Sequence, residues 1–378
     1  MNRRVVVVGA GPIGLAAALG AVRRGHDVTV LERDQVGGAL LRWGGVRLFS
    51  PVSMNLTPEI AEVLGGSCPA ADALLTGTEH VAQVLRPVAA HLGERVRVGH
   101  RVVAIGRAGM RRGDYPNHPI RAERPFRLVV EADGRGSWLE ADAVLDATGV
   151  YGTPQWLGSG GLPAPGEPAA PVIRDLGGLR DALPRLADRR VVLVGHGHSA
   201  AHAVRWLGDA GASVVWATRS GNTRPCVDVA NDPLPERARV VGDANGLAAR
   251  PPPWLRVERR ATVEAIAPRE VRLSGGRVVT EVDAIVGLVG YRPDLGPVSE
   301  LALEVAPTTE GTARLALALA GVTDCLTVPR VSPDDLETGE PGYVRVGANS
   351  YGRATTFLLR TGFAQLAQVL DRLGAPRS

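Results

Sequence analysis

Residues 4–14 read RVVVVGAGPIG, a run of four valines followed by three glycines in the spacing G-x-G-x-x-G. A continuous apolar run of this kind is typical of a strand buried on both faces of a parallel sheet. In the turn that follows, Gly9 permits a tight bend, Gly11 lets the backbone approach a pyrophosphate, and Gly14 lets a helix pack closely on the strand. The stretch predicts the first half of a dinucleotide-binding α/β unit.

The residues after this turn complete the expected unit. An alanine- and leucine-rich helix runs from Leu15 to about Arg24, and its N-terminus offers free N–H groups to an anion. The segment HDVTVLE (26–32) predicts a second strand that ends on Glu32, where a carboxylate accepts the ribose hydroxyls of an adenosine. Because that carboxylate repels a 2′-phosphate, we expect this site to hold FAD or NAD.

The same pattern returns in residues 189–219. RRVVLVGHGHSA (189–200) predicts another buried strand and glycine turn, and GASVVWATR (211–219) predicts another second strand. Thr218 follows Gly195 at the distance at which Glu32 follows Gly9, which indicates an internal repeat. Arg219 stands beside Thr218 and no acid is present there, so the second site is expected to take NADPH rather than NADH. The residues predicted to bind NADPH are Gly195, Gly197, His198, Ser199 and Arg219.

Segments rich in glycine and proline divide the chain. The stretch 158–171 predicts a linker, and a buried strand within residues 282–290 precedes the return to the first domain. We expect an α/β protein with two Rossmann-like dinucleotide-binding domains. The NAD(P)H-binding domain, residues 165–290, is expected to be inserted into an FAD-binding domain made of residues 1–160 and 291–378.

Composition narrows the class of protein. The 378 residues are enough for two α/β cores, and a net charge of +4 that is not gathered in one segment argues against a nucleic-acid partner. The N-terminus enters the first strand directly, and no apolar run approaches the roughly 20 residues of a spanning helix. We therefore expect a cytoplasmic protein with a small-molecule substrate and no membrane partner, and a homodimer is left open. Cys68, Cys226 and Cys325 form no C-x-x-C, which removes the usual redox dithiol of disulfide reductases.

Together these motifs resemble the flavoproteins with two dinucleotide-binding domains, which include the thioredoxin-reductase-like reductases and the class B flavin monooxygenases. The resemblance rests on GAGPIG with Glu32, GG (37–38), DATG (146–149), GHGHSA (195–200), GYRPD (290–294) and the glycine loop at Gly347. It implies FAD in the first domain and NAD(P)H in the inserted domain. The usual Gly-Asp of the last loop is replaced here by Gly347-Ala348-Asn349, so Asn349 would stand in for the acid. The residues assigned to FAD are Gly9, Gly11, Pro12, Gly14, Glu32, Arg33, Gly38, Thr148, Gly149, Gly347 and Asn349.

Two functions fit these motifs. The first is an NADPH-consuming monooxygenase that oxygenates a nitrogen or sulfur atom of a small molecule. Its candidate catalytic residue is Asn55, because related monooxygenases carry in this region an Asn near the flavin that can hydrogen-bond a peroxide. However, the F-x-G-x-x-x-H-x-x-x-W/F fingerprint of the Baeyer–Villiger and N-oxygenating enzymes is missing before the second domain.

The second function is an NADPH-dependent reductase that passes electrons to a quinone, a ferredoxin-type protein or another external acceptor. A non-catalytic nucleotide sensor is a third class, against which both intact glycine turns argue. No metal site is expected, because His196 and His198 occupy variable positions of a glycine turn and no fourth ligand is near them or His202.

Overall fold

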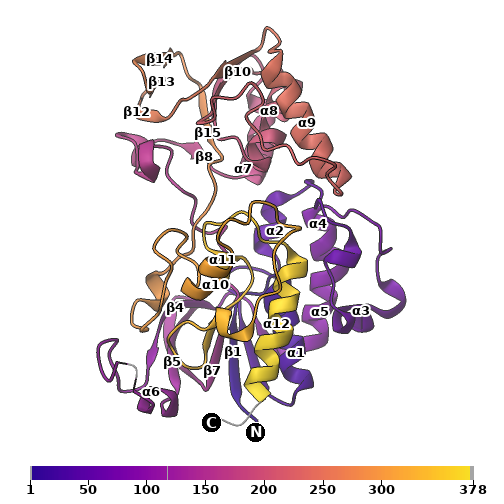
Figure 1. Cartoon of the computed structure of the whole chain (residues 1–378), viewed down its shortest axis with the longest axis vertical. Coiled ribbons are helices and arrows are strands. Elements are labelled where there is room, and N and C mark those ends of the chain that lie inside the picture. The colour runs from indigo at the N-terminus through magenta and orange to yellow at the C-terminus, as the bar shows by residue number, and fades with distance from the viewer. Residues whose placement is uncertain (1, 117, 375–378) are drawn as a thin grey trace. The chain divides into compact units, whose positions relative to one another are not determined.

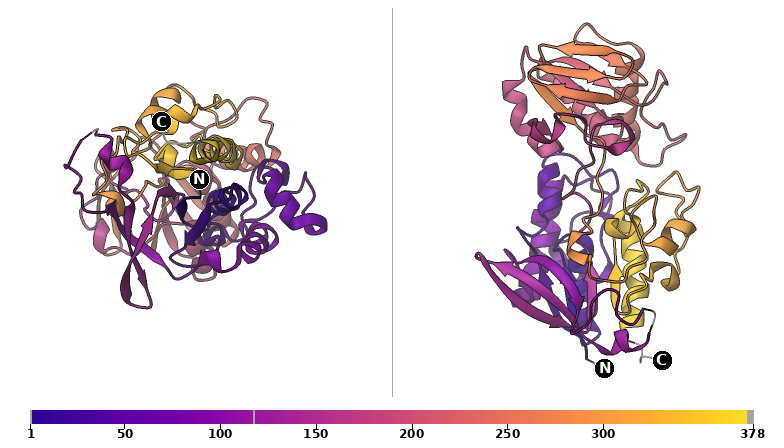
Figure 2. Two further views of the ribbon diagram at one scale, coloured as in Figure 1. Left: turned by 90° about the horizontal axis from the view of Figure 1, so that it is seen from below. Right: turned by 90° about the vertical axis from the view of Figure 1, so that its left-hand side faces the viewer.

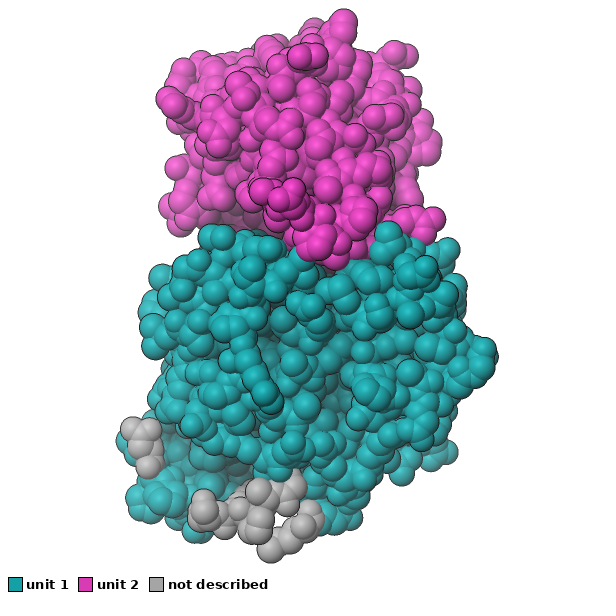
Figure 3. Space-filling view, turned by 45° about the vertical axis from the view of Figure 1, so that its right-hand side comes forward, with its two compact units in different colours: residues 1–41, 50–153, 292–378 teal, residues 42–49, 154–291 magenta. Residues whose placement is uncertain are grey.

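The computed structural model describes residues 2–116 and 118–374 and divides into two compact units, coloured separately in Figure 3. The first unit contains residues 1–41, 50–153 and 292–378, and the second contains residues 42–49 and 154–291. The second unit is thus an insertion in the chain of the first, and most of it is the segment 154–291. The segment 42–49 belongs to the second unit, a feature that the sequence did not indicate.

A five-stranded parallel sheet forms the centre of the first unit, in the order β16-β7-β1-β2-β3. The four valines of β1 are buried, as the apolar run predicts for a central strand with helices on one face. The strands are β1 (Arg4–Val8), β2 (Asp27–Leu31), β3 (Val96–Arg97), β7 (Ala143–Asp146) and β16 (Tyr343–Arg345).

Helices cover one face of this sheet (Figure 1). Helix α1 (Pro12–Arg23) packs against the long C-terminal helix α12 (Leu359–Gly374) so closely that a Cβ on Gly20 would lie 2.4 Å from Leu370 Cδ1. The helical segment of residues 77–92 contains a π-helical turn. It consists of α4 (Gly77–His80), the π-turn Val81–Leu85 and α5 (Arg86–Leu92), and α3 (Pro58–Leu64) lies beside α5.

A three-stranded antiparallel sheet covers the other face. Its strands are β4 (Arg101–Arg107), β5 (Phe126–Ala132) and β6 (Arg135–Ala141), and β5 and β6 pair as an antiparallel hairpin. Phe126 and Leu128 pack with Val6 and Val8 in one apolar cluster. The parallel sheet therefore lies between a helical layer and an antiparallel layer.

The second unit repeats this plan with a parallel sheet in the order β11-β10-β9-β15-β8. Val191 and Leu193 of β9 face the helices, whereas Val192 and Val194 face the antiparallel β12–β14 sheet, which is drawn in orange in the right-hand view of Figure 2. The strands are β8 (Val172–Ile173), β9 (Arg190–Val194), β10 (Ser213–Ala217), β11 (Leu255–Glu258), β12 (Val263–Ala267), β13 (Glu270–Leu273), β14 (Arg277–Thr280) and β15 (Ala284–Gly287). The helices are α7 (Leu176–Ala182), α8 (His198–Asp209) and α9 (Pro235–Ala249).

The two copies match residue by residue. Strand β9, helix α8 and strand β10 each begin and end 186 positions after β1, α1 and β2, the distance from Gly9 to Gly195. The predicted fold class, two Rossmann-like domains with the second inserted in the first, is confirmed by these sheets.

Several short helices complete the chain. They are α2 (Gly38–Trp43), α6 (Ile120–Glu123), α10 (Ala313–Ala318) and α11 (Ala348–Tyr351). In the described ranges, none of the helices combines the length and apolar character that a bilayer crossing requires.

Candidate functional site

The first glycine turn is shaped by contacts that leave no room for side chains at two of its three glycines. Gly9 has φ +103°, and a Cβ there would lie 2.8 Å from the Ala147 carbonyl oxygen. A Cβ on Gly14 would lie 1.9 Å from the Gly9 carbonyl oxygen. At Gly11, in contrast, a Cβ would meet no atom within 4 Å. Gly9 and Gly14 thus hold the turn together, while Gly11 borders open space at the N-terminus of α1, where a pyrophosphate fits.

The Glu32 carboxylate lies beside this turn and is held in place by two backbone amides. The Ala10 N–H donates to Oε2 at 2.9 Å, and the Asp34 N–H donates to Oε1 at 2.9 Å. The half-buried side chain retains further lone pairs on both oxygens. Glu32 is therefore fixed at the carboxyl end of β2, beside the first glycine turn, and its contact with ribose hydroxyls stays a prediction.

Other residues predicted to bind the first nucleotide lie at the same edge. Gly149 has φ +67° and open space beyond its Cα, and Gly38 begins α2 with open space as well. A Cβ on Gly347 would lie 3.0 Å from Ile13, so the C-terminal glycine loop packs directly on the first turn of α1, beside Pro12. Arg33 is exposed and donates from Nε to Asp34 at 3.2 Å.

Thr148 and Asn349 are brought together by a buried hydrogen-bond network that sequence reasoning missed. Asn349 Nδ2 donates to Thr148 Oγ1 at 3.0 Å, and Thr148 Oγ1 donates to Asp146 Oδ1 at 2.7 Å. The Tyr343 hydroxyl donates to Asp146 Oδ2 at 2.5 Å, and Arg345 Nε donates to Asn349 Oδ1 at 3.0 Å. Burial, with the Asp146 charge, raises the pKa of Tyr343 well above its ordinary value, so the phenol stays protonated as the donor.

Within this network, the Asn349 side chain links two segments of the first unit. Its side chain is 2% exposed and its amide oxygen accepts from the Arg345 guanidinium, so the amide ties strand β16 to the Thr148 turn. Contact of Asn349 with FAD stays a prediction.

Asn55 is also buried and hydrogen-bonded. The Ser50 hydroxyl donates to Asn55 Oδ1 at 2.8 Å, and Asn55 Nδ2 donates to the Ser50 carbonyl oxygen at 2.8 Å. The Asn55 side chain, 3% exposed, closes the turn that contains the 3-10 helix Val52–Met54. The catalytic assignment of Asn55 stays a prediction, and it requires this pair to open.

The second glycine turn has the backbone conformation of the first. Gly195 has φ +124°, and a Cβ there would lie 2.2 Å from the Leu288 carbonyl oxygen. Gly197 borders open space and caps α8 with φ −83° and ψ −175°, almost the values of Gly11, −81° and −175°. The second unit therefore offers the same cradle for a pyrophosphate.

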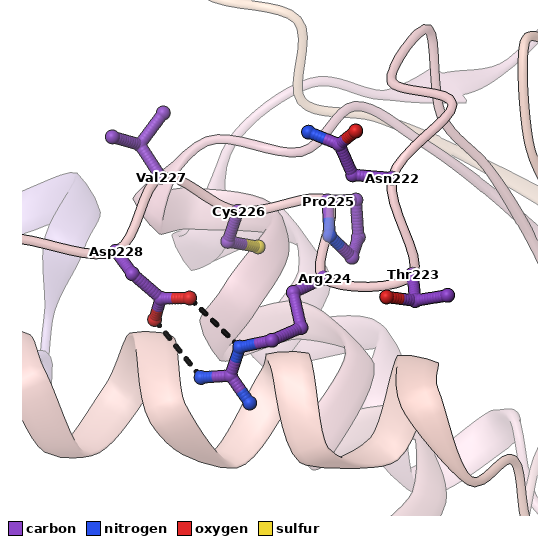
Figure 4. A pocket seen from close by; sticks show the side chains of 7 residues that line it. All are labelled: Asn222, Thr223, Arg224, Pro225, Cys226, Val227 and Asp228. Atoms are coloured by element: carbon purple, nitrogen blue, oxygen red, sulfur yellow. Dashed lines mark hydrogen bonds and ion pairs between the residues drawn. The ribbon is translucent and has the colours of Figure 1, made fainter.

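Beyond this turn, the end of β10 is where the two copies differ. Thr218 is buried, and its hydroxyl donates to the Ser220 carbonyl oxygen at 3.1 Å. Arg219 is exposed, and in the described part of the chain its side chain has no hydrogen bond or ion pair. Arg224 donates from Nε and Nη2 to the Asp228 carboxylate at 2.8 and 3.0 Å, and Figure 4 shows these two side chains turned toward each other. They line a surface pocket of about 490 Å³ formed by residues 222–228.

The first turns of α8 pack against an aromatic side chain from the segment 42–49. Phe49, from the segment 42–49, lies edge-on to His198 at 5.2 Å between ring centroids and is stacked on His202 at 5.9 Å. Burial lowers the pKa of His202 to about 4, so this ring is neutral at pH 7. Ser199, the next residue after His198, is half-buried. Within residues 2–116 and 118–374, no three His, Cys, Asp or Glu side chains gather as a metal site would require.

Sequence comparison with known proteins finds similarity at the N-terminus of the chain. Residues 4–46 match the family model of FAD-dependent oxidoreductases. The small chain of glutamate synthase [NADPH] from Mycobacterium tuberculosis is 60% identical over 43 residues, which are 11% of this chain and 9% of that protein. Phytoene dehydrogenase of Streptomyces griseus is 46% identical over 61 residues, 15% of this chain and 12% of that protein. The chain thus matches only about a tenth of the length of these relatives.

Solved structures match the whole chain. Bacillithiol disulfide reductase Bdr from Bacillus cereus superposes with a TM-score of 0.75 at 18% identity, covering 99% of both chains. Thioredoxin reductase from T. acidophilum gives a TM-score of 0.62 at 17% identity, again covering 99% of both. The chain has the thioredoxin reductase fold. A flavin monooxygenase from Stenotrophomonas maltophilia shares this fold with a TM-score of 0.62 at 21% identity, covering 99% of this chain and all of that one.

Within the thioredoxin reductase fold, the cysteines of this chain lie in three separate loops and form no disulfide. Cys226 is buried, and Asn245 of α9 holds its backbone by bonding both its N–H and its carbonyl oxygen at 2.9 and 3.0 Å. Burial raises the pKa of the Cys226 thiol to about 12, with Asp228 adding to the effect. Cys226 is therefore an unreactive thiol at neutral pH.

Proposed function

We propose that this protein is an FAD-dependent oxidoreductase that takes reducing equivalents from NADPH and delivers them to an external acceptor. The observation that carries this proposal is the pair of register-matched glycine turns, one followed by Glu32 and the other by Thr218 and Arg219. One turn suits a nucleotide with free ribose hydroxyls, and the other suits one with a 2′-phosphate.

In the first unit, the open space at Gly11 and the free N–H groups of α1 fit the pyrophosphate of FAD. Glu32 would accept hydrogen bonds from the adenosine ribose, since two amides already aim its carboxylate. FAD, when bound, supplies the two-electron chemistry, whereas the chain supplies binding and orientation.

In the second unit, two arginines support the choice of NADPH. Arg219 is the second residue after β10 and is exposed without an ion pair to any described residue. Arg224 is held by Asp228, and that bond raises the pKa of Arg224, so its charge is permanent. No carboxylate occupies the position of Glu32, because Thr218 stands there and is buried. A 2′-phosphate at the end of β10 would therefore meet the charge of Arg219 and no carboxylate at the position that Glu32 occupies in the first unit.

For the acceptor, we favour an external electron acceptor such as a quinone, a ferredoxin-type protein or a low-molecular-weight disulfide. Asn55, the residue that oxygenation would need, is engaged with Ser50 through both ends of its amide. Cys226 is unreactive, and the described cysteines form no disulfide, so an internal dithiol relay is not part of the proposal.

Oxygenation of a nitrogen or sulfur atom is the second candidate. One observation favours it: among the described residues, Asn55 Nδ2 donates one hydrogen bond, to the Ser50 carbonyl, and so keeps a second N–H. If the Ser50–Asn55 pair opens when substrate binds, this amide can donate to an oxygen atom beside FAD.

Rapid mixing separates the two candidates. The purified protein should carry the visible absorbance of flavin, and NADPH should bleach it without oxygen. The bleached protein is then mixed with a quinone or a disulfide, and separately with oxygen plus candidate amines and sulfides. Fast recovery with a quinone or disulfide, and no oxygenated product, supports the reductase. An oxygenated product that is lost in the Asn55→Ala variant supports the monooxygenase, and a protein that binds no flavin refutes both.

A further inference from the structure

The turn after β10 has a neighbour from a different part of the chain. Strands β10 and β11 are adjacent and parallel, with Ala217 opposite Glu258. The residues that follow them therefore emerge at the same edge of the sheet, and Arg259 and Arg260 lie beside the 218–221 turn. The backbone confirms this arrangement, because the Arg260 N–H donates to the Ser220 carbonyl oxygen at 3.2 Å.

Arg260 is fitted to this turn in two ways. Its φ is +49°, in the left-handed region that residues other than glycine rarely adopt. A Cβ on Gly221 would lie 2.7 Å from Arg260 Nε and 3.3 Å from its Cγ, so the arginine side chain lies directly over the glycine. Any larger residue at position 221 would displace the guanidinium from the turn. Unusual backbone conformations of this kind concentrate at binding sites.

Most arginines near this edge already have partners. Arg259 donates to the carbonyl oxygens of Asn222 and Ala248, and Glu258 pairs with the two arginines that flank it, Arg256 and Arg277. In contrast, the side chains of Arg219 and Arg260 are both exposed, and in the described ranges neither makes a hydrogen bond or an ion pair. Two unpaired cations on adjacent turns attract a doubly charged anion.

We infer that Arg260 and Arg219 form the two sides of a site for the 2′-phosphate of the nucleotide, and that Arg260 is a determinant of NADPH specificity. This inference rests on the proposed function, since it assigns the nucleotide of the second unit. The phosphate lies between the turn after β10 and the turn after β11. Arg219 supplies one positive charge from the turn after β10. Arg260 supplies a second charge from the turn after β11, more than 40 positions later in the chain.

Calorimetric titration of the full-length protein with 2′,5′-ADP and with 5′-AMP tests the site without reference to activity. Replacement of Arg260 by Ala or by Asn should weaken binding of 2′,5′-ADP by about tenfold, the loss expected for one charge-assisted contact, and leave 5′-AMP unchanged. The Asn variant is included because Asn tolerates the left-handed conformation. Arg256→Ala is the matched control: it removes an exposed cation from β11 that pairs with Glu258 at 3.1 Å, and both affinities should stay unchanged.

The outcomes distinguish this inference from the function on which it rests. If the unaltered protein binds neither probe, the proposed nucleotide site itself is wrong. If the unaltered protein prefers 2′,5′-ADP and both Arg260 variants keep the full preference, only the inference about Arg260 is wrong. An equal loss for both probes would show that Arg260 supports the turn rather than the phosphate, which also overturns the inference.

Discussion

Glu340 offers a direct test of how charge burial holds the first unit together. Its side chain is fully buried between two arginines: Arg107 Nε donates to Oε1 at 2.8 Å and Arg121 Nη2 donates to Oε2 at 2.6 Å. The Ala302 N–H donates to Oε2 at 3.0 Å. These bonds join the segment before β16 to β4 and α6.

The perturbation is Glu340→Gln, which keeps the shape of the side chain and removes its charge. Two buried guanidinium groups then lose their shared anion, while Arg107 keeps an acceptor in the Arg124 carbonyl and Arg121 one in the Asp114 carbonyl. Removing one partner of a buried ion pair typically costs about 3–5 kcal/mol, because the remaining charge stays desolvated. For a domain of this size, such a loss lowers the melting temperature by roughly 6–20 °C.

Glu140 provides the matched control. It also pairs with two arginines, Arg4 at 3.4 Å and Arg127 at 3.1 Å, but its side chain is 38% exposed. Exposed pairs of this kind contribute little to stability because solvent screens them, so Glu140→Gln should shift the melting temperature by at most about 4 °C.

The assay is thermal unfolding of the full-length protein and both variants, followed by far-UV circular dichroism at one protein concentration and one ionic strength. We expect Glu340→Gln to melt well below the other two proteins. Equal melting temperatures for the two variants would refute the reasoning, because both acids pair with two arginines and only Glu340 is buried.

Other predictions follow from the same structure. Burial lowers the pKa of His80 to about 4 from an ordinary value near 6.5, and neither ring nitrogen has a partner among the described residues. The unfolded chain therefore takes up a proton at a higher pH than the folded protein does. The free energy of unfolding should fall by about 3 kcal/mol between pH 6.5 and 4. Urea unfolding of a His80→Leu variant should lack most of this fall, and an unchanged pH dependence would contradict the assignment. Burial alone would raise the pKa of Glu340, but hydrogen bonds from Arg121 and Arg107 lower it overall. The Glu340 carboxylate therefore stabilises the folded protein above the carboxyl pKa of the unfolded chain, and this stabilisation is lost as the pH falls through the lower native pKa. The difference in unfolding free energy between the unaltered protein and Glu340→Gln should accordingly disappear in acid. Gly14→Ala should yield protein without bound flavin, since the new Cβ would lie 1.9 Å from a backbone oxygen, and retained flavin absorbance would show that the turn can adjust. Cys226→Ala should leave the rate of NADPH oxidation within about twofold of the unaltered protein, because a thiol with a pKa of about 12 stays protonated at pH 7. A large loss of rate would contradict this expectation and indicate that Cys226 takes part in the redox reaction.

Much of the fold could be predicted because its signals are local. The valine run of β1, the glycine spacing at Gly9–Gly14 and the acid at Glu32 all lie within one βαβ unit, and the second copy repeats them in register. The π-turn Val81–Leu85 was not predicted, because the spacing of apolar residues does not report whether a turn is α- or π-helical. Helix α9 was not predicted, because its apolar pattern is weak: Arg237 and Asn245 lie on its buried face, and Gly242 and Gly246 lie within it.

The sequence by itself determined that this chain folds as two nucleotide-binding α/β units, because strand burial, glycine geometry and helix starts depend on residues a few positions apart. Only the tertiary structure decided what the polar side chains do. It joined Asn349 to Thr148, closed Asn55 against Ser50, and placed Arg260 over Gly221. These partners, apart from Ser50, are separated by tens to hundreds of residues, and no periodicity encodes such contacts; they arise when separate elements pack at one edge of a sheet.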